Sequence, residues 1–255
     1  MIELLQFRHS PYNEKARWAL DLKHVPHLRR SLLPGPHMGV VKPLTGGTGT
    51  PVIRHDGGVI DGSAHIIEWL DAEFPQPRLI PADDSARDEA LRIQRRFDDD
   101  LTPRIRCTVL DTLLANPGYF SRVFCDGRPR AVQIGYAMIV PLAAPLVRKG
   151  NGITGAAAVE DGHTAARQAL DFVAERTAAT GYLVGDTFTV ADLTAASTLA
   201  VLARPTDSPM AAPQPVAPAF AALMARYANH SAVAWTLAMY ARHRGAAKDF
   251  DGPSG

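Results

Sequence analysis

Cysteine is scarce in this chain: its 255 residues include only two, Cys107 and Cys125. Two cysteines are too few for a disulfide framework and lack the spacing of metal ligands, so we expect both to be reduced, with no metal bound. Net charge is nearly absent as well, because 27 Lys and Arg side chains oppose 26 Asp and Glu. Such a balance offers nothing to nucleic-acid phosphates or to an anionic membrane surface, and we expect neither partner.

Long apolar runs are also missing. The most apolar region, 136–147, is short and carries Pro141 and Pro145, whereas a transmembrane helix needs about 18 uninterrupted apolar residues. The first residues lack the basic segment and the small-residue cleavage site of a signal peptide. These observations predict a cytoplasmic protein. With 46% apolar residues, the chain has enough core for one large or two ordinary globular domains.

Residues 1–80 mix strand-like and helix-like segments. Short apolar runs typical of strands occur at 2–7, 27–33, 50–53 and 58–60. Helical periodicity occurs at 12–23 and from Ser63 to 74, and the glycines and prolines of 33–49 predict a loop. Asp56-Gly57 favours a hairpin between the last two strands. A right-handed crossover in the first half then predicts a four-stranded mixed sheet covered by helices.

Residues 84–245 show helical periodicity throughout, which predicts a second, all-helical domain after the first one at 1–80. Helical stretches are expected at 92–114, 131–148, 162–180 and, in two pieces, 219–244. Pro103 should bend the first of them. Thr189 and Asp192 have the spacing of a capping box, the clearest helix start in the chain. The tail, 246–255, is expected to be disordered.

Ser10 stands between the first strand and the first helix, with Pro11 behind it. One interpretation is structural: Ser10 caps the helix and proline occupies its favoured first position. The other is functional. Free backbone N–H groups and the positive end of the helix dipole favour an anion such as a thiolate. A hydroxyl that donates a hydrogen bond to that thiolate would lower the thiol pKa.

Four motifs then occur in order along the chain: Ser-Pro-Tyr-Asn-Glu-Lys-Ala-Arg-Trp at 10–18, Gly-Thr-Pro-Val-Ile at 49–53, Asp-Gly-Ser-Ala-His-Ile-Ile-Glu-Trp-Leu at 61–70, and Gly-Asp-Thr-Phe-Thr-Val-Ala-Asp-Leu at 185–193. Together they resemble the glutathione transferase superfamily, in its cytosolic type with serine at the thiol-activating position. The resemblance spans almost the whole chain. It implies a thioredoxin-like N-terminal domain, an all-helical C-terminal domain, and a homodimer with glutathione bound near the domain interface.

The resemblance also assigns roles to single residues. Ser10 is similar to the residue that activates the glutathione sulfur, and Pro51 to the family's cis-proline. The backbone of Thr50 would pair with the cysteinyl part of glutathione like an added strand. Ser63 resembles the serine whose hydroxyl and N–H hold the γ-glutamyl carboxylate. The residue before it is Gly62, where the family usually has an acidic residue or Gln.

Further departures concern the rest of the glutathione site. Because Gly62 has no side chain, either Asp61 reaches the amino group of glutathione or that contact is lost. Lys42 is the one residue in 33–49 with a charge suited to the glycyl carboxylate, unless it is simply a solvated lysine. Asn13 stands where relatives often carry cysteine. Residues 10 and 13 are therefore both without a thiol, which argues against disulfide exchange.

Several other side chains have both a functional and a structural interpretation. Tyr12 is the second choice for the hydroxyl that faces the sulfur, and it could equally well pack in the core. His9 and His65 flank the expected site and could tune a thiolate, although structural histidines are commoner. Arg17, on the same helix as Ser10, is expected to face solvent.

The expected electrophile pocket and the capping residues lie in the helical domain. Tyr119, Phe120 and Phe124 could line a pocket for an apolar electrophile, or could form ordinary core. Thr189 and Asp192 resemble the family's structural capping motif, so we expect them to serve folding.

The leading hypothesis is a glutathione-dependent transferase that conjugates the glutathione thiolate to a small hydrophobic electrophile, a detoxification type of reaction. Isomerisation, dehalogenation or peroxide reduction would use the same residues. The alternative is a non-catalytic relative that binds a ligand or a protein partner.

Overall fold

A computed structural model describes residues 1–245; the expected disordered tail, 246–255, lies outside the described residues. Its N-terminal part holds four strands, β1 (Ile2–Gln6), β2 (His27–Ser31), β3 (Val52–His55) and β4 (Gly58–Asp61), and three helices, α1 (Pro11–Leu22), α2 (Met38–Thr45) and α3 (Ser63–Glu73). The strand order is β2-β1-β3-β4, with β1 and β2 parallel and the other neighbours antiparallel. This is the predicted mixed sheet.

The two faces of the sheet pack against different helices. Leu4 and Ile53 point to the face shared with α1 and α3 and belong to the main core. Their neighbours Leu5 and Val52 point to the opposite face and form a small separate cluster with Val41 of α2. A period of two is what places successive side chains on opposite sides of a strand.

The segment 33–49 is not the expected continuous loop. Helix α2 occupies Met38–Thr45 and ends at Gly46, whose φ of +76° lies in the left-handed region that favours glycine. Pro43 stands inside the helix. Val41 is the only buried residue of α2. Because the surrounding glycines and prolines outnumber its apolar residues, the sequence pattern predicts a loop here instead of a helix.

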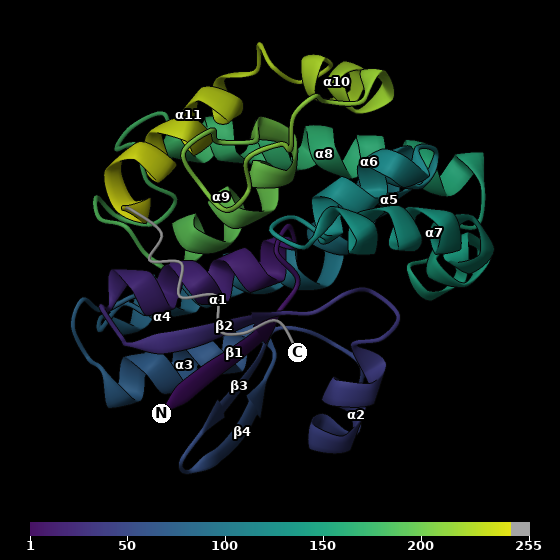
Figure 1. Ribbon diagram of the computed structural model, residues 1–255. Coiled ribbons are helices and arrows are strands. Elements are labelled where there is room, and N and C mark those ends of the chain that lie inside the picture. Colours follow the sequence, from purple (N-terminus) through teal and green to yellow (C-terminus); the bar gives the residue numbers. More distant parts are fainter. Residues whose placement is uncertain (246–255) are drawn as a thin grey trace.

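The C-terminal part is helical throughout its described length. Its elements are α4 (Asp84–Arg95), α5 (Thr102–Leu114), α6 (Pro117–Phe124), α7 (Arg130–Gly150), α8 (Ala156–Thr177), α9 (Val190–Ala203), α10 (Pro218–Ala225) and α11 (Ser231–Met239), with π-helical turns η1 (Arg96–Leu101) and η2 (Tyr240–Arg244). Most of them form a helical layer above the sheet, with α1 between the two, whereas α4 lies lower, at the level of α1 (Figure 1). The fold is thus a thioredoxin-like domain followed by an all-helical domain, as predicted.

The expected long helix at 92–114 begins earlier, at Asp84, and is interrupted by the π-helical turn η1. Pro103 is the second residue of α5, directly after this turn. Proline lacks an N–H and its ring clashes with the carbonyl four residues earlier, so a locally wider turn accommodates it without breaking the helix. The predicted bend at Pro103 therefore takes the form of a π-helical turn.

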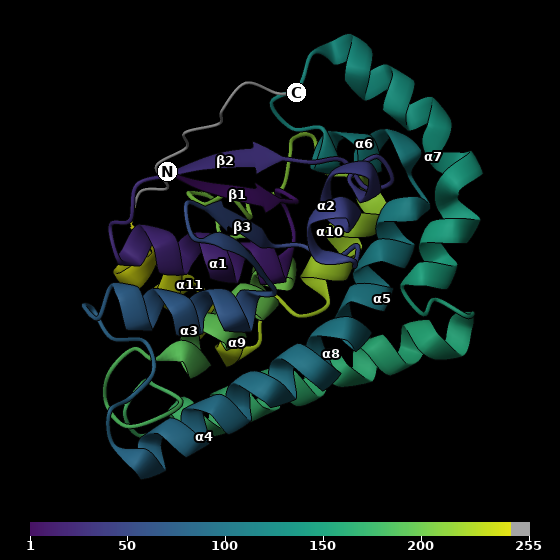
Figure 2. The same cartoon turned by 90° about the horizontal axis from the view of Figure 1, so that it is seen from below.

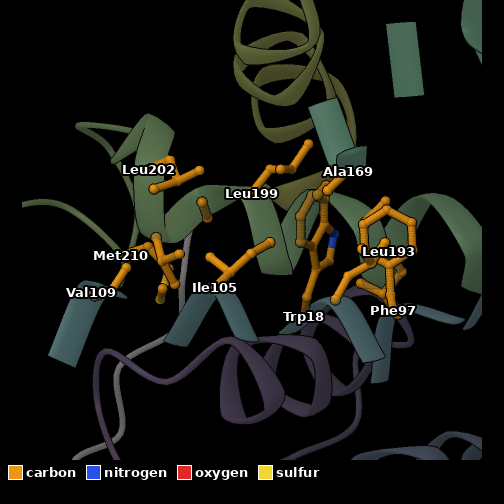
Figure 3. Close-up of a cluster of buried hydrophobic side chains, with 14 of the residues drawn as sticks. Trp18, Phe97, Ile105, Val109, Ala169, Leu193, Leu199, Leu202 and Met210 are labelled. Atoms are coloured by element: carbon orange, nitrogen blue, oxygen red, sulfur yellow. The ribbon is translucent and has the colours of Figure 1, made fainter. Parts of the chain in front are cut away.

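One continuous core joins the two parts of the molecule. Trp18 of α1 is fully buried and reaches between Phe97, Leu193 and Leu199 of the helical layer (Figure 3). Its ring stacks on Phe188 with centroids 5.4 Å apart, and its indole N–H donates to the carbonyl of His243 at 3.0 Å. Helix α1 is consequently held to the C-terminal part by a ring contact and a hydrogen bond.

Helix α7 corrects the expectation about apolar length. It runs unbroken for 21 residues through both Pro141 and Pro145, and by length and composition alone it could cross a membrane. Most of its surface is exposed, which distinguishes it from a buried core helix. It lies at the rim of the helical layer, on the side away from α3 (Figure 2).

Candidate functional site

Ser10 occupies the N-cap position of α1 in an extended conformation, with φ −94° and ψ +133°. Its carbonyl accepts the first helical hydrogen bond, from the N–H of Glu14 at 2.9 Å. Its hydroxyl does not cap the helix, and within residues 1–245 it has no hydrogen-bond partner. Pro11 at the next position starts the helix without needing a donor. A half-buried, uncommitted hydroxyl therefore stands at the positive end of a 12-residue helix.

The first turn of α1 is tied to the loop before β3 by Asn13. The Asn13 side chain is fully buried and its Nδ2 donates to Oγ1 of Thr50 at 3.0 Å. The peptide bond between Thr50 and Pro51 is cis, in agreement with the resemblance. The Oδ1 atom of Asn13 is buried and has no partner among the described residues. A buried acceptor without a donor is costly, and because this atom is enclosed it presents no surface to a ligand.

The cis-proline in turn contacts the start of α3. The N–H of Gly62 donates to the carbonyl of Pro51 at 3.0 Å. Gly62 is the N-cap of α3 and has φ +83°, a conformation that favours glycine and gives a physical reason for the missing acidic residue or Gln. Ser63 follows as the first residue of the helix and is buried. Its hydroxyl has no hydrogen-bond partner in the described part of the chain.

Ser10, Thr50, Pro51 and Ser63 therefore belong to one connected region, in which two helix N-termini flank a cis-proline. Asp61, the last residue of β4, is exposed beside it. Its carbonyl, not its carboxylate, contacts Nδ1 of His65 at 2.9 Å, and this leaves the carboxylate free to turn towards a ligand. The N-termini of α1 and α3 both lie in this region, and the positive ends of their dipoles favour an anionic ligand.

Tyr12 is committed elsewhere. Its hydroxyl donates to the backbone carbonyl of Asp98 at 2.7 Å, and its ring lies 6.0 Å from the guanidinium of Arg106. Burial raises the pKa of the Tyr12 hydroxyl far above its ordinary value. A hydroxyl already donated to a carbonyl cannot also donate to a thiolate, so the geometry favours Ser10 over Tyr12.

The other polar candidates, His9, His65 and Lys42, differ in burial and in their contacts. His9 is buried within 3.5 Å of the Arg204 guanidinium, and burial, reinforced by that positive charge, moves the pKa of His9 well below its ordinary value. His65 is exposed on α3 and Lys42 is exposed on α2. Lys42 forms no ion pair among residues 1–245, so its charge is available to a ligand carboxylate.

Arg17 does not face solvent, contrary to expectation. It is 1% exposed and its Nε donates to Oε2 of Glu14 at 2.8 Å, while Nη1 donates to Gln6 at 2.7 Å. Arg244 of η2 donates to the other Glu14 oxygen at 2.7 Å and to Asp21 at 2.7 Å. Burial tends to raise the pKa of the Glu14 carboxyl, but the two guanidinium groups outweigh it and the pKa is lowered. The polar face of α1 is thus an internal ion-pair network.

Two of the three aromatic residues considered for an electrophile pocket, Tyr119 and Phe120, are core residues, and Phe124 is half-buried. Tyr119 and Phe120 belong to α6, a helix that the sequence pattern did not reveal, and are 1% and 2% exposed. Tyr119 packs on Phe220 at 5.5 Å, and Phe120 packs on Phe124 at 4.6 Å. Rings covered in this way present no surface to a ligand, so their structural interpretation holds.

The capping box is formed as predicted. The hydroxyl of Thr189 accepts from the N–H of Ala191 at 3.3 Å, and the Asp192 carboxylate accepts from the N–H of Thr189 at 2.9 Å. The same carboxylate accepts from the N–H of Leu183 at 2.8 Å and thereby holds the preceding loop. Burial raises the pKa of Asp192 to about 6. Both residues contribute to folding.

The two cysteines are free and buried, and burial raises the pKa of both thiols. The Cys107 thiol donates to the carbonyl of Asn151 at 3.0 Å. Protonated, enclosed thiols are poor nucleophiles. Within the described residues, no three His, Cys, Asp or Glu side chains are grouped so as to hold a metal ion.

Two family models match this chain. Residues 4–78 match the model described as glutathione S-transferase, N-terminal domain, and residues 136–231 match that of the C-terminal domain. The chain belongs to the glutathione transferase superfamily. No curated protein sequence matches it.

Solved structures show the same fold at low identity. A glutathione S-transferase from Rhodospirillum rubrum F11 is 18% identical, with TM-score 0.61 over 95% of this chain and 89% of that chain. One from Methylobacillus flagellatus KT, with glutathione bound, is 18% identical, with TM-score 0.59 over 98% and 99%. The beta-etherase LigF from Sphingobium sp. strain SYK-6 is 19% identical, with TM-score 0.59 over 93% and 98%. At these identities, the likeness concerns the fold alone.

Proposed function

We propose that the protein is a glutathione-dependent transferase in which Ser10 stabilises the glutathione thiolate. The observation that carries the proposal is the uncommitted Ser10 hydroxyl at the N-terminus of α1. A hydroxyl that donates to sulfur, together with the helix dipole, favours the thiolate over the thiol and lowers the thiol pKa. The chain belongs to a family whose solved members include glutathione complexes.

The residues around Ser10 fit glutathione. The N-terminus of α3, with Ser63, suits the γ-glutamyl carboxylate, and Asp61 suits the amino group. The backbone of Thr50, ahead of the cis-proline, suits the cysteinyl backbone, and the free charge of Lys42 suits the glycyl carboxylate.

The reaction that follows is nucleophilic substitution or addition. The thiol loses its proton to solvent, the thiolate sulfur forms a bond to an electrophilic carbon, and a leaving group, where there is one, departs with its electron pair. Ser10 holds the sulfur and the helical layer holds the apolar part of the electrophile. A cytoplasmic homodimer acting in detoxification is part of this proposal, because the family resemblance implies it.

The first test is calorimetric titration of the full chain with reduced glutathione, followed by turnover with 1-chloro-2,4-dinitrobenzene as the probe electrophile. Ser10→Ala should keep the fold and reduce turnover by about a hundredfold, as the loss of one donor to a catalytic anion does. The pH profile of the variant should shift upward, because the bound thiol pKa rises. Ser85→Ala, an exposed serine on α4, is the control.

Two outcomes contradict the proposal at different points. Unchanged turnover in Ser10→Ala removes Ser10 from the mechanism while leaving a glutathione enzyme. No detectable binding of glutathione at millimolar concentration favours the alternative, a relative that binds another ligand or a protein partner.

A further inference from the structure

Arg204, directly after α9, is a buried cation without a carboxylate partner. The Lys and Arg side chains that are buried in residues 1–245 are Lys15, Arg17, Lys23, Arg29, Arg204 and Arg244. All of them except Arg204 form an ion pair with an Asp or Glu carboxylate. Arg204 is 6% exposed and forms none within the described chain. A buried charge without a counter-charge is unfavourable, so this exception calls for a physical explanation.

Backbone carbonyls and an aromatic ring hold the Arg204 guanidinium in place. Its Nε donates to the carbonyl of Val201 at 3.1 Å, and its Nη1 donates to the carbonyl of Met210 at 3.2 Å. The central carbon of the guanidinium lies 4.8 Å from the centre of the Phe220 ring. The backbone of Arg204 has φ +48°, in the left-handed region that favours glycine. These contacts fix the position of the charge without neutralising it.

The groups that face Arg204 leave its charge uncompensated. Burial lowers the pKa of the guanidinium to about 10, so it stays protonated at neutral pH. Tyr119 of α6 and Tyr240 of η2 are the titratable groups nearest to it, and burial raises the pKa of both hydroxyls. Both tyrosines are therefore neutral. Arg122, which lies 5.2 Å from the centre of the Tyr119 ring, adds a further positive charge.

His9 connects this charge to the candidate site. Nη1 of Arg204 lies 3.5 Å from Nδ1 of His9, and His9 directly precedes Ser10. Burial, followed by the charges of Arg204, Arg17 and Arg8, holds the pKa of His9 well below its ordinary value, so the imidazole is neutral. Arg17 and Arg8 each have a carboxylate partner, whereas Arg204 has none in the described residues. A positive field from Arg204 consequently reaches the residue next to Ser10.

Bonded geometry limits how far the guanidinium of Arg204 can lie from Ser10. The 3.5 Å contact, the length of the His9 side chain and the step of about 3.8 Å between consecutive Cα atoms together allow no more than about 11 Å. At about 10 Å and an effective dielectric constant of about 20 to 40, a unit positive charge lowers the pKa of an acid by about 0.5 to 1. Because the guanidinium is buried, dissolved salt screens this effect only weakly.

We propose that the buried charge of Arg204 acts through space on the candidate site and favours the thiolate form of bound glutathione. The thiolate in turn supplies the negative charge that the guanidinium lacks. Arg204 is enclosed and does not touch the sulfur, so its effect adds to those of the Ser10 hydroxyl and the α1 dipole. The proton of the thiol leaves to solvent. This inference rests on the proposed function and assigns it a second, more distant contributor.

The experiment measures the pKa of the bound glutathione thiol from the ultraviolet absorbance of the thiolate, with the full chain. Arg204→Gln keeps side-chain donors for the two carbonyls but removes the charge. It should raise the bound thiol pKa by about 0.5 to 1. Above that pKa, the dissociation constant of glutathione should rise about threefold to tenfold. S-methylglutathione has no ionisable thiol, so it should bind Arg204→Gln as tightly as the wild type.

The controls separate the charge of Arg204 from its structural contacts. Arg204→Lys keeps the charge and should restore most of the wild-type thiol pKa. Arg176→Gln makes the same change at an exposed arginine of α8 that donates to the carbonyl of Leu183, and it should leave the thiol pKa unchanged. Added salt should not remove the difference between wild type and Arg204→Gln. A purely structural role would weaken binding of glutathione and S-methylglutathione alike.

A second measurement covers the case in which circular dichroism shows that Arg204→Gln does not fold. The magnetic resonance signal of the Arg204 Nε–H group is identified by its absence from Arg204→Lys. In the wild type this signal should move when glutathione binds above the bound thiol pKa, and should stay in place with S-methylglutathione.

The possible failures can be told apart. A folded Arg204→Gln with the wild-type thiol pKa would overturn the inference and leave the proposed function intact. Equal weakening of glutathione and S-methylglutathione binding, or an Nε–H signal that responds equally to both ligands or to neither, would do the same. A wild-type protein that binds neither ligand at millimolar concentration would overturn the proposed function and this inference together.

Discussion

Replacing Glu14 with Gln tests whether the buried ion pairs hold α1 in place. The Glu14 carboxylate is fully buried and accepts hydrogen bonds from Arg17 at 2.8 Å and Arg244 at 2.7 Å. Gln keeps the shape but removes the charge, which leaves the buried guanidinium groups of Arg17 and Arg244 without the carboxylate that they share. Breaking a buried pair from one side costs about 3–5 kcal/mol. We expect the free energy of unfolding to fall by that amount.

Urea denaturation at pH 7, followed by circular dichroism, measures this loss. Glu160→Gln is the matched control: Glu160 pairs with Arg167 on the exposed surface, and its replacement should leave the urea midpoint nearly unchanged. Adding Arg17→Met to Glu14→Gln should recover at least about 1 kcal/mol, because one uncompensated positive charge disappears. A loss in Glu14→Gln no larger than in the control would refute the reasoning.

The same carboxylate gives the prediction a pH dependence. The folded-state pKa of Glu14 is lowered, so its stabilising effect is complete above the unfolded-state value and is lost as the pH falls through the folded-state value. Wild type and Glu14→Gln should therefore converge in stability in acid. A gap that stays constant down to the acid transition would show that the charge of Glu14 contributes nothing.

Three further predictions concern other residues. The pKa of Asp192 is raised to about 6, so its carboxyl binds a proton more tightly in the folded than in the unfolded protein. Relative to Asp192→Asn, the wild type should lose about 2 kcal/mol as the pH rises from 4 to 7, measured by urea denaturation. Tyr12→Phe should lower stability by about 1 kcal/mol through the lost bond to Asp98 and leave glutathione turnover unchanged, as a kinetic assay would show. Lys42→Met should raise the dissociation constant of glutathione severalfold in calorimetry without moving the thermal midpoint, since Lys42 is exposed.

The sheet and the capping box could be predicted from the sequence because their signals are local. The hairpin depends on Asp56-Gly57 between two short apolar runs, and the start of α9 depends on Thr189 and Asp192 three residues apart. Each pattern works within a few residues and needs no partner from elsewhere. The π-helical turn before Pro103 was foreseen only as a bend, since a proline shows where a helix is disturbed but not how.

The parts that could not be predicted depend on partners distant in sequence. In the sequence, nothing distinguishes Arg17 from a surface arginine. In the structure it pairs with Glu14, and Glu14 also pairs with Arg244, more than two hundred residues later in the chain. The motif makes Tyr12 a candidate site residue, and only the structure shows that its hydroxyl donates to the Asp98 carbonyl. In the candidate site, the motif identifies Ser10, but only the structure shows that its hydroxyl is not used as a helix cap.

These distant contacts also connect the candidate site to the helical layer. Ser10 and Asn13 lie at one end of α1, and the same helix is held further along by Trp18 against Phe188 and by Glu14 against Arg244. The position of the Ser10 hydroxyl relative to Thr50 thus depends on how α1 is fixed by the C-terminal domain. A substitution in the ion pairs of Glu14 that leaves the protein folded should therefore weaken glutathione binding, although Glu14 does not contact the ligand. A substitution at an exposed position, such as Glu160→Gln, should not weaken it.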